Sequence, residues 1–128
     1  MPATILVIED NIESRDAVTI WLERAGYSVI VANDGSEGLS RAVDSKPDLI
    51  ITDLVMPKLN GIETIKFLRS IPSLERSLPI IAATSRGMEL AEQAMNAGAD
   101  KIIGKPYDAE ILLAVVKSLL RAKTLASS

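Results

Sequence analysis

Short apolar runs alternate along the chain with longer segments of mixed polarity. Each run is almost solidly apolar and lacks the alternation of apolar and polar residues that a half-exposed strand shows. Such runs are typical of strands that are buried on both faces. We therefore predict five strands, at residues 4–8, 28–32, 48–52, 79–83 and 101–103.

The segments between these runs have the spacing of amphipathic helices. In the first of them, Val18, Trp21, Leu22 and Ala25 stand at positions i, i+3, i+4 and i+7, which is one helical face. Turn-forming residues mark three of the passages from helix to strand: Gly26, Pro47 and Gly98. A strand–helix unit repeated five times predicts an α/β domain, with a parallel sheet, right-handed connections and helices on both faces.

The composition limits the chemistry. The chain has 128 residues, enough for a single domain, and contains no cysteine and no histidine. Disulfides, thiolate or imidazole metal sites and Ser-His-Asp catalysis are therefore excluded. Any metal would be held by oxygen atoms, which suits Mg²⁺ or Ca²⁺.

Charge and hydropathy argue against nucleic acid and membrane as partners. The formal net charge is −3 and the basic residues are scattered, so attraction to nucleic acid is not expected. No apolar run approaches the roughly 18 to 20 residues of a membrane span. The first residues have no basic segment leading into a long apolar stretch, so we expect a cytoplasmic protein without a signal peptide.

Polar residues gather where the predicted strands end. Ligands of open parallel sheets bind at the carboxyl ends of the strands, so these residues form the candidate site. They are Glu9, Asp10 and Asn11, then Asn33, Asp34 and Gly35, then Asp53, then Thr84 and Ser85, and finally Gly104, Lys105 and Pro106.

Three of these residues are acidic, and they converge if the first and third strands are neighbours. The carboxylates of Glu9, Asp10 and Asp53 would then repel one another, and a divalent cation such as Mg²⁺ would relieve the repulsion. Helix capping is an alternative for the pair at 9–10 and the preferred interpretation for Asn11. An ordinary loop acid is the alternative for Asp53.

Thr84 and Lys105 add the opposite polarity at the same edge. A hydroxyl and an ammonium can both bind a phosphoryl oxygen, and the ammonium can also pair with a carboxylate. Taken singly, a threonine there can cap a helix, and a loop lysine is usually solvated. Together with the acids, they indicate an aspartate that accepts a phosphoryl group with the help of a metal.

Five motifs in this order match a known family. They are "VIED" at 7–10, "ITDLVMPKLNG" at 51–61, "PIIAATS" at 79–85, "AGAD" at 97–100 and "GKPYD" at 104–108. The chain resembles, from Thr4 to about Arg121, the receiver domain of bacterial two-component response regulators, including the stand-alone chemotaxis regulator. The resemblance implies a doubly wound, flavodoxin-like (βα)5 fold with strand order 2-1-3-4-5, and residues 1–128 as one receiver domain.

The resemblance also implies a phosphoacceptor and its metal site. Asp53 would accept the phosphoryl group. Asp10 and Asp53 would bind Mg²⁺ together with the backbone carbonyl of Val55, and Glu9 would act largely through water. Met56-Pro57 and Gly61 would shape the loop after the acceptor, where Pro57 cannot extend a strand and Gly61 permits a sharp entry into the next helix.

The resemblance assigns roles to two further residues at this edge. Thr84 and Lys105 would contact the phosphoryl group, and the Lys105–Pro106 bond would be cis.

The resemblance also implies the partners. A histidine kinase or a phosphotransfer protein would supply the phosphoryl group. The output would be altered binding to a downstream protein, and the only catalysis would be the domain's own phosphorylation and dephosphorylation.

Some positions depart from the family's pattern. Ile102 stands where an aromatic residue usually changes rotamer with phosphorylation, and we interpret it as core of the last strand. Tyr107 replaces a common phenylalanine and is expected to pack rather than to signal. Val55 and Arg86 flank the acceptor, and a valine there cannot orient an attacking water, so we expect slow loss of the phosphoryl group.

The last two predicted helices and the tail carry further expectations. The final helix has more apolar residues than one buried face needs, so a partner surface or a homodimer through these two helices is one hypothesis. The tail at about 123–128 is expected to be frayed.

Three alternatives to the phosphorylated switch stand beside it. A constitutive interaction module, or the receiver fragment of a longer regulator, would share the fold. An aspartyl-nucleophile phosphatase would need a second acid where Val55 stands. A flavin carrier would need a phosphate-binding loop after the first strand, where "EDNIES" is acidic and lacks glycine.

Overall fold

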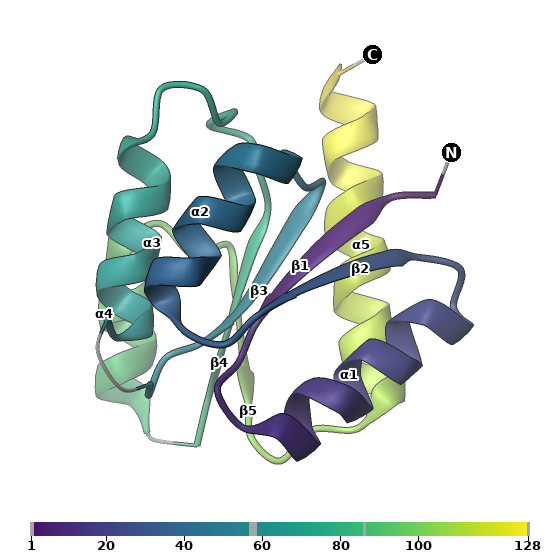
Figure 1. Cartoon of the computed structure of the whole chain (residues 1–128), viewed down its shortest axis with the longest axis horizontal. Coiled ribbons are helices and arrows are strands. Elements are labelled where there is room, and N and C mark those ends of the chain that lie inside the picture. The colour runs from purple at the N-terminus through teal and green to yellow at the C-terminus, as the bar shows by residue number, and fades with distance from the viewer. Residues whose placement is uncertain (1, 57–58, 86, 128) are drawn as a thin grey trace.

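Strands and helices alternate throughout the described residues 2–56, 59–85 and 87–127 of a computed structural model (Figure 1). The strands are β1 (Thr4–Ile8), β2 (Ser28–Ala32), β3 (Leu49–Asp53), β4 (Ile80–Thr84) and β5 (Lys101–Gly104). The helices are α1 (Ile12–Arg24), α2 (Gly35–Ser45), α3 (Gly61–Ser70), α4 (Met88–Ala97) and α5 (Ala109–Ser127).

The strands form one parallel sheet in the order β2-β1-β3-β4-β5, as predicted. Helices α1 and α5 cover one face, and α2, α3 and α4 cover the other (Figure 1). The register pairs Ile8 with Thr52 and Asp53 with Ala83. The residues that follow β1, β3 and β4 therefore emerge side by side at one edge of the sheet.

The solidly apolar runs are explained by the two layers of helices. On β1, Leu6 and Ile8 belong to the core under α2, α3 and α4, whereas Ile5 and Val7 belong to the core under α1 and α5. All of these side chains are almost completely buried. Alternate side chains thus enter two separate cores, so neither face of the strand needs polar residues.

The helix ends follow the predicted chemistry. The Asn11 side chain accepts a hydrogen bond from the Ser14 amide at 2.9 Å, which confirms Asn11 as the cap of α1. Gly26 and Gly98 have φ angles of 98° and 125°, which favour glycine and confirm them as turns. The turn before Pro47 places Lys46 in the left-handed region.

The tail is part of the last helix. Helix α5 continues through Ser127, and the fraying expected from about residue 123 stays a prediction. Residues 121–125 are Arg, Ala, Lys, Thr and Leu, mostly strong helix formers, and the Lys123 ammonium lies 3.7 Å from the Glu75 carboxylate. None of the described helices is both long and apolar enough to cross a membrane.

Arg69 on α3 connects three parts of the α2–α4 side of the fold. Its Nε and Nη2 atoms donate to the Gly98 carbonyl at 3.0 and 2.8 Å, and Nη2 also lies 3.0 Å from Asp100 Oδ2. The same carboxylate oxygen accepts a hydrogen bond from the Ile80 amide at 2.8 Å. One guanidinium therefore links α3 to the α4–β5 turn and to the start of β4.

We expect Arg69→Ala to lower the free energy of unfolding by about 2 kcal/mol, because it removes charge-assisted hydrogen bonds and leaves a part-buried carbonyl unpaired. Urea denaturation measures the loss. Arg76→Ala is the matched control, since the Arg76 side chain is exposed and only its carbonyl binds Arg69. Equal stability of the two variants would contradict this role.

Candidate functional site

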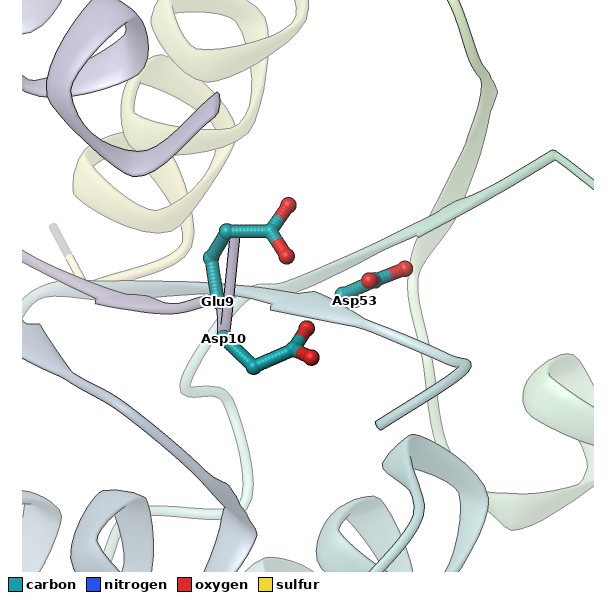
Figure 2. A group of neighbouring side chains, drawn as sticks. All are labelled: Glu9, Asp10 and Asp53. Carbon is teal, nitrogen blue, oxygen red and sulfur yellow. The ribbon is translucent and has the colours of Figure 1, made fainter. Parts of the chain in front are cut away.

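Three carboxylates meet at the carboxyl edge of neighbouring strands β1 and β3. Glu9 and Asp10 follow β1 directly, and Asp53 is the last residue of β3. Figure 2 shows the side chains of Glu9 and Asp10 extending toward Asp53. One oxygen from each residue lies within 4.8 Å of the others. The predicted convergence of the three acids is confirmed.

The surroundings of these acids differ. Glu9 is 5% exposed and Asp53 is 9% exposed, whereas Asp10 is open to solvent. A buried carboxylate without a partner is unfavourable, so two of the three acids need a cation or donors nearby. Glu9 accepts a hydrogen bond from the Asn11 amide at 3.2 Å, which satisfies only part of this need.

Lys105 supplies the nearby cation. Its ammonium lies 2.6 Å from Glu9 Oε1 and 3.3 Å from Asp53 Oδ2. Burial by itself lowers the pKa of Lys105, but the hydrogen bond to Glu9 and the charge of Asp53 outweigh burial, so the pKa is raised above its ordinary value. The ammonium therefore stays charged at neutral pH and joins the strand ends of β1 and β3.

The charges at this edge remain unequal. Glu9, Asp10 and Asp53 contribute −3 and Lys105 contributes +1, which leaves −2. Oxygen ligands from three carboxylates and a deficit of two positive charges match the requirements of Mg²⁺, a hard divalent cation. The residues present therefore fit the predicted metal.

Thr84 ends β4 beside this cluster and is 3% exposed. Its carbonyl accepts a hydrogen bond from the Lys105 amide at 2.8 Å, so the segments after β4 and β5 are connected by their backbones. The Lys105–Pro106 bond is cis, as the resemblance implied. Thr84 therefore lies at the same edge of the sheet as the acids, and its contact with a phosphoryl group stays a prediction.

Two of the predicted departures can be located. Ile102 is partly buried and packs against the core under α2, α3 and α4, which supports its interpretation as core. Tyr107 packs edge-to-face on Trp21, with ring centroids 6.3 Å apart, and burial raises the pKa of its phenol. Pro57 and Arg86 lie outside the described residues, so the expectations for them stay predictions.

Gly61 fixes the end of β3 in a way that the turn pattern did not reveal. A Cβ atom at Gly61 would lie 2.2 Å from the Asp53 carbonyl oxygen and 2.5 Å from Leu54 Cα. The Gly61 amide also donates to the Leu54 carbonyl at 3.1 Å. Glycine is needed here for space, whereas the sequence suggested only a sharp turn. Gly61 therefore holds α3 directly against the backbone of Asp53.

A polar network at the β2 end of the site was also missed. Arg15 on α1 donates to the Asn33 side chain, and the Asn33 amide donates to Glu37 Oε1 at 2.9 Å. Arg15 Nη1 also approaches the Glu9 carbonyl at 3.4 Å. The only sequence signal was the position of Asn33 after a strand, because partners 18 residues apart follow from the fold.

Comparison with known proteins places this geometry in a family. Residues 5–117 match the family model described as the response regulator receiver domain. The response regulator MprA of Mycolicibacterium vanbaalenii is 38% identical over 125 residues, covering 97% of this chain and 53% of that protein. The alkaline phosphatase synthesis transcriptional regulatory protein PhoP of Bacillus subtilis is also 38% identical, over 99% of this chain and 52% of its own length.

Solved structures agree with the sequence relatives. The chemotaxis protein CheY4 of Vibrio cholerae superposes with a TM-score of 0.88 at 32% identity, covering 93% of this chain and 99% of that chain. A CheY-like receiver domain protein from Methanospirillum hungatei gives a TM-score of 0.92 at 26% identity, covering 98% and 99%. The chain spans about half the length of the curated relatives it matches.

We expect Gly61→Ala to lower the free energy of unfolding by about 2 kcal/mol or more, although an alanine inside a helix is normally about 1 kcal/mol better than glycine. The substitution is expected to destabilise the protein because the new methyl group would overlap the backbone of residues 53 and 54. Urea denaturation measures the change in the free energy of unfolding.

Gly104→Ala serves as the control for this variant, since a Cβ there meets no atom within 4 Å. An alanine at 61 that stabilises the protein, or matches the control, would show that α3 does not hold the Asp53 backbone.

Proposed function

The chain belongs to the response regulator receiver domains, and from this premise we propose that it is a switch phosphorylated on Asp53 by a histidine kinase or a phosphotransfer protein. Receiver domains are signalling switches rather than classical enzymes. The observation that carries the proposal is the Asp53 carboxylate at the strand edge, with Lys105 at 3.3 Å and two further acids within metal-binding distance.

In the transfer step, the two carboxylate oxygens of Asp53 would have different roles. Lys105 binds Oδ2, so Oδ1 is available to attack the phosphorus atom of a phosphohistidine. The O–P bond forms as the P–N bond breaks, and the electron pair leaves with the donor's imidazole, which then takes a proton. Negative charge spreads over the phosphoryl oxygens, and the Lys105 ammonium and the Thr84 hydroxyl would stabilise it.

Glu9, Asp10 and Asp53 would hold Mg²⁺, with the Val55 carbonyl as a further ligand. When bound, the metal neutralises charge on the phosphoryl oxygens. Glu9 already binds Lys105 at 2.6 Å, which supports a role for Glu9 through water. With the metal the site would be neutral, since +2 and +1 balance −3.

Switching would follow from the added charge. Phosphorylation replaces one negative charge on Asp53 by about two, which attracts Lys105 and Thr84 toward the new group. Because the Lys105 amide binds the Thr84 carbonyl at 2.8 Å, the segments after β4 and β5 would shift together. Ile102 stands where other receiver domains have an aromatic residue that changes rotamer, so that change is not available here. The shift of the two segments would instead alter the surface of α4 and α5.

The downstream partner would be a protein that distinguishes these two surfaces. Met95 on α4 and Ile111 on α5 are large, exposed apolar side chains, which supports a protein contact or a homodimer through these helices. A phosphatase is the weaker alternative, because Val55 stands where its second acid would be. A constitutive module would not need the full set of acids, Thr84 and Lys105.

Phosphorylation is tested by intact-mass measurement after incubation with acetyl phosphate and Mg²⁺. We expect one phosphoryl adduct on the parent chain and on Asp44→Ala, an exposed-acid control, and none on Asp53→Ala. Chelation of Mg²⁺ should suppress the adduct. An adduct that survives at full yield in Asp53→Ala would rule out Asp53 as the acceptor.

The lifetime of the phosphoryl group is tested at Val55, which is 45% exposed beside Asp53. We expect Val55→Asn to accelerate its loss several-fold, roughly 3- to 10-fold, because an amide can orient a water molecule for attack and a valine cannot. The decay of the adduct with time, after the phosphodonor is removed, provides the rate. Equal rates in parent and variant would contradict the assignment.

A further inference from the structure

A groove lies beside the acidic site on the side of α1 and α5. One wall is α1, with Ala17, Val18 and Trp21, and the other is the segment after β5, with Pro106 and Tyr107. Its volume is about 470 Å³. That lies within the roughly 300 to 1,000 Å³ typical of small-molecule sites, which are also mostly apolar with a few polar groups.

Two of the chain's few aromatic rings form a corner of this groove. The rings of Trp21 and Tyr107 have centroids 6.3 Å apart and planes inclined at 66°. Both side chains are half-buried, so each keeps part of its ring surface exposed. Aromatic ring faces attract cations, and that of tryptophan does so most strongly.

The charges around the groove favour a cation as well. Glu13 and Lys105 are its charged lining residues. The Lys105 ammonium is already matched by Glu9 and Asp53, at 2.6 and 3.3 Å. Glu13 makes no ion pair with the described part of the chain, so its charge is the uncompensated one.

The remaining polar lining is neutral. Ser14 and Ser85 also line the groove, and a serine hydroxyl can donate or accept hydrogen bonds. Arg15, the nearby cation on α1, is not among the lining residues and binds Asn33 and the Glu9 carbonyl instead. Among the described residues that line the groove, Lys105 is therefore the only positive group.

We propose that this groove binds a small organic cation that carries an aromatic ring. The ammonium would pair with Glu13, and the ring would pack against Trp21 and Tyr107. The site is separate from the phosphoryl-accepting carboxylate but shares Lys105 with it. An occupant would therefore contact the same segment that places the Lys105 ammonium on Asp53.

Trp21 is the single tryptophan of the chain, so its fluorescence reports directly on the groove. The probe is 2-phenylethylammonium, titrated with selective excitation of tryptophan. 3-Phenylpropionate has the ring without the positive charge, and butylammonium has the charge without the ring. We expect 2-phenylethylammonium to change the tryptophan fluorescence saturably. We expect 3-phenylpropionate and butylammonium each to bind at least about fivefold more weakly.

Variants test the location of the site. We expect Glu13→Gln to weaken 2-phenylethylammonium binding about threefold, as for one part-exposed charge pair. Ala17→Leu should fill the groove and weaken binding about tenfold or more. Glu23→Gln on the same helix and Ala114→Leu on α5 are exposed controls that should bind like the parent.

Three results would overturn the proposal: no saturable signal with 2-phenylethylammonium, equal binding of 3-phenylpropionate, or unchanged affinity in both Glu13→Gln and Ala17→Leu. Circular dichroism verifies that each variant keeps its helices. Glu13→Gln replaces an exposed side chain, so it tests the charge even if Ala17→Leu perturbs the packing of α1.

Discussion

The two ion pairs of Lys105 are the interaction on which the site depends. They hold together the carboxylates of Glu9 and Asp53, which are almost completely buried and would otherwise repel each other. The three residues come from segments far apart in the chain, after β1, within β3 and after β5. A single ammonium can serve both acids only because the parallel sheet brings these strand ends to one edge.

The rest of the fold keeps that edge in place. Strands β3 and β4 are buried along their whole length, so the end of β3 has little freedom to move. Gly61 brings α3 into contact with the backbone of Asp53, and the Thr84 carbonyl fixes the Lys105 amide. The charged side chains of the candidate site are thus held mainly by backbone contacts, which would preorganise their charge for a phosphoryl group.

The same ion pairs connect Asp53 with the molecule's surface. Lys105 lies between Asp53 and the groove formed by Trp21 and Tyr107, and its amide is joined to the end of β4. A change in charge at Asp53 would therefore act on one lysine that is attached to several surface segments. This arrangement offers a physical route for signalling that needs no aromatic residue at position 102.

The sequence by itself determined the alternating elements, the identity of the acidic, hydroxyl and ammonium groups, and their place at the strand ends, because periodicity and turn residues are local properties. It did not reveal that the Lys123 ammonium on α5 lies 3.7 Å from the Glu75 carboxylate, because the two residues are far apart in the chain. Only the tertiary structure decided that Lys105 binds Glu9 most closely and that Gly61 must lack a side chain. Both depend on distances between segments remote in sequence, which no local pattern encodes.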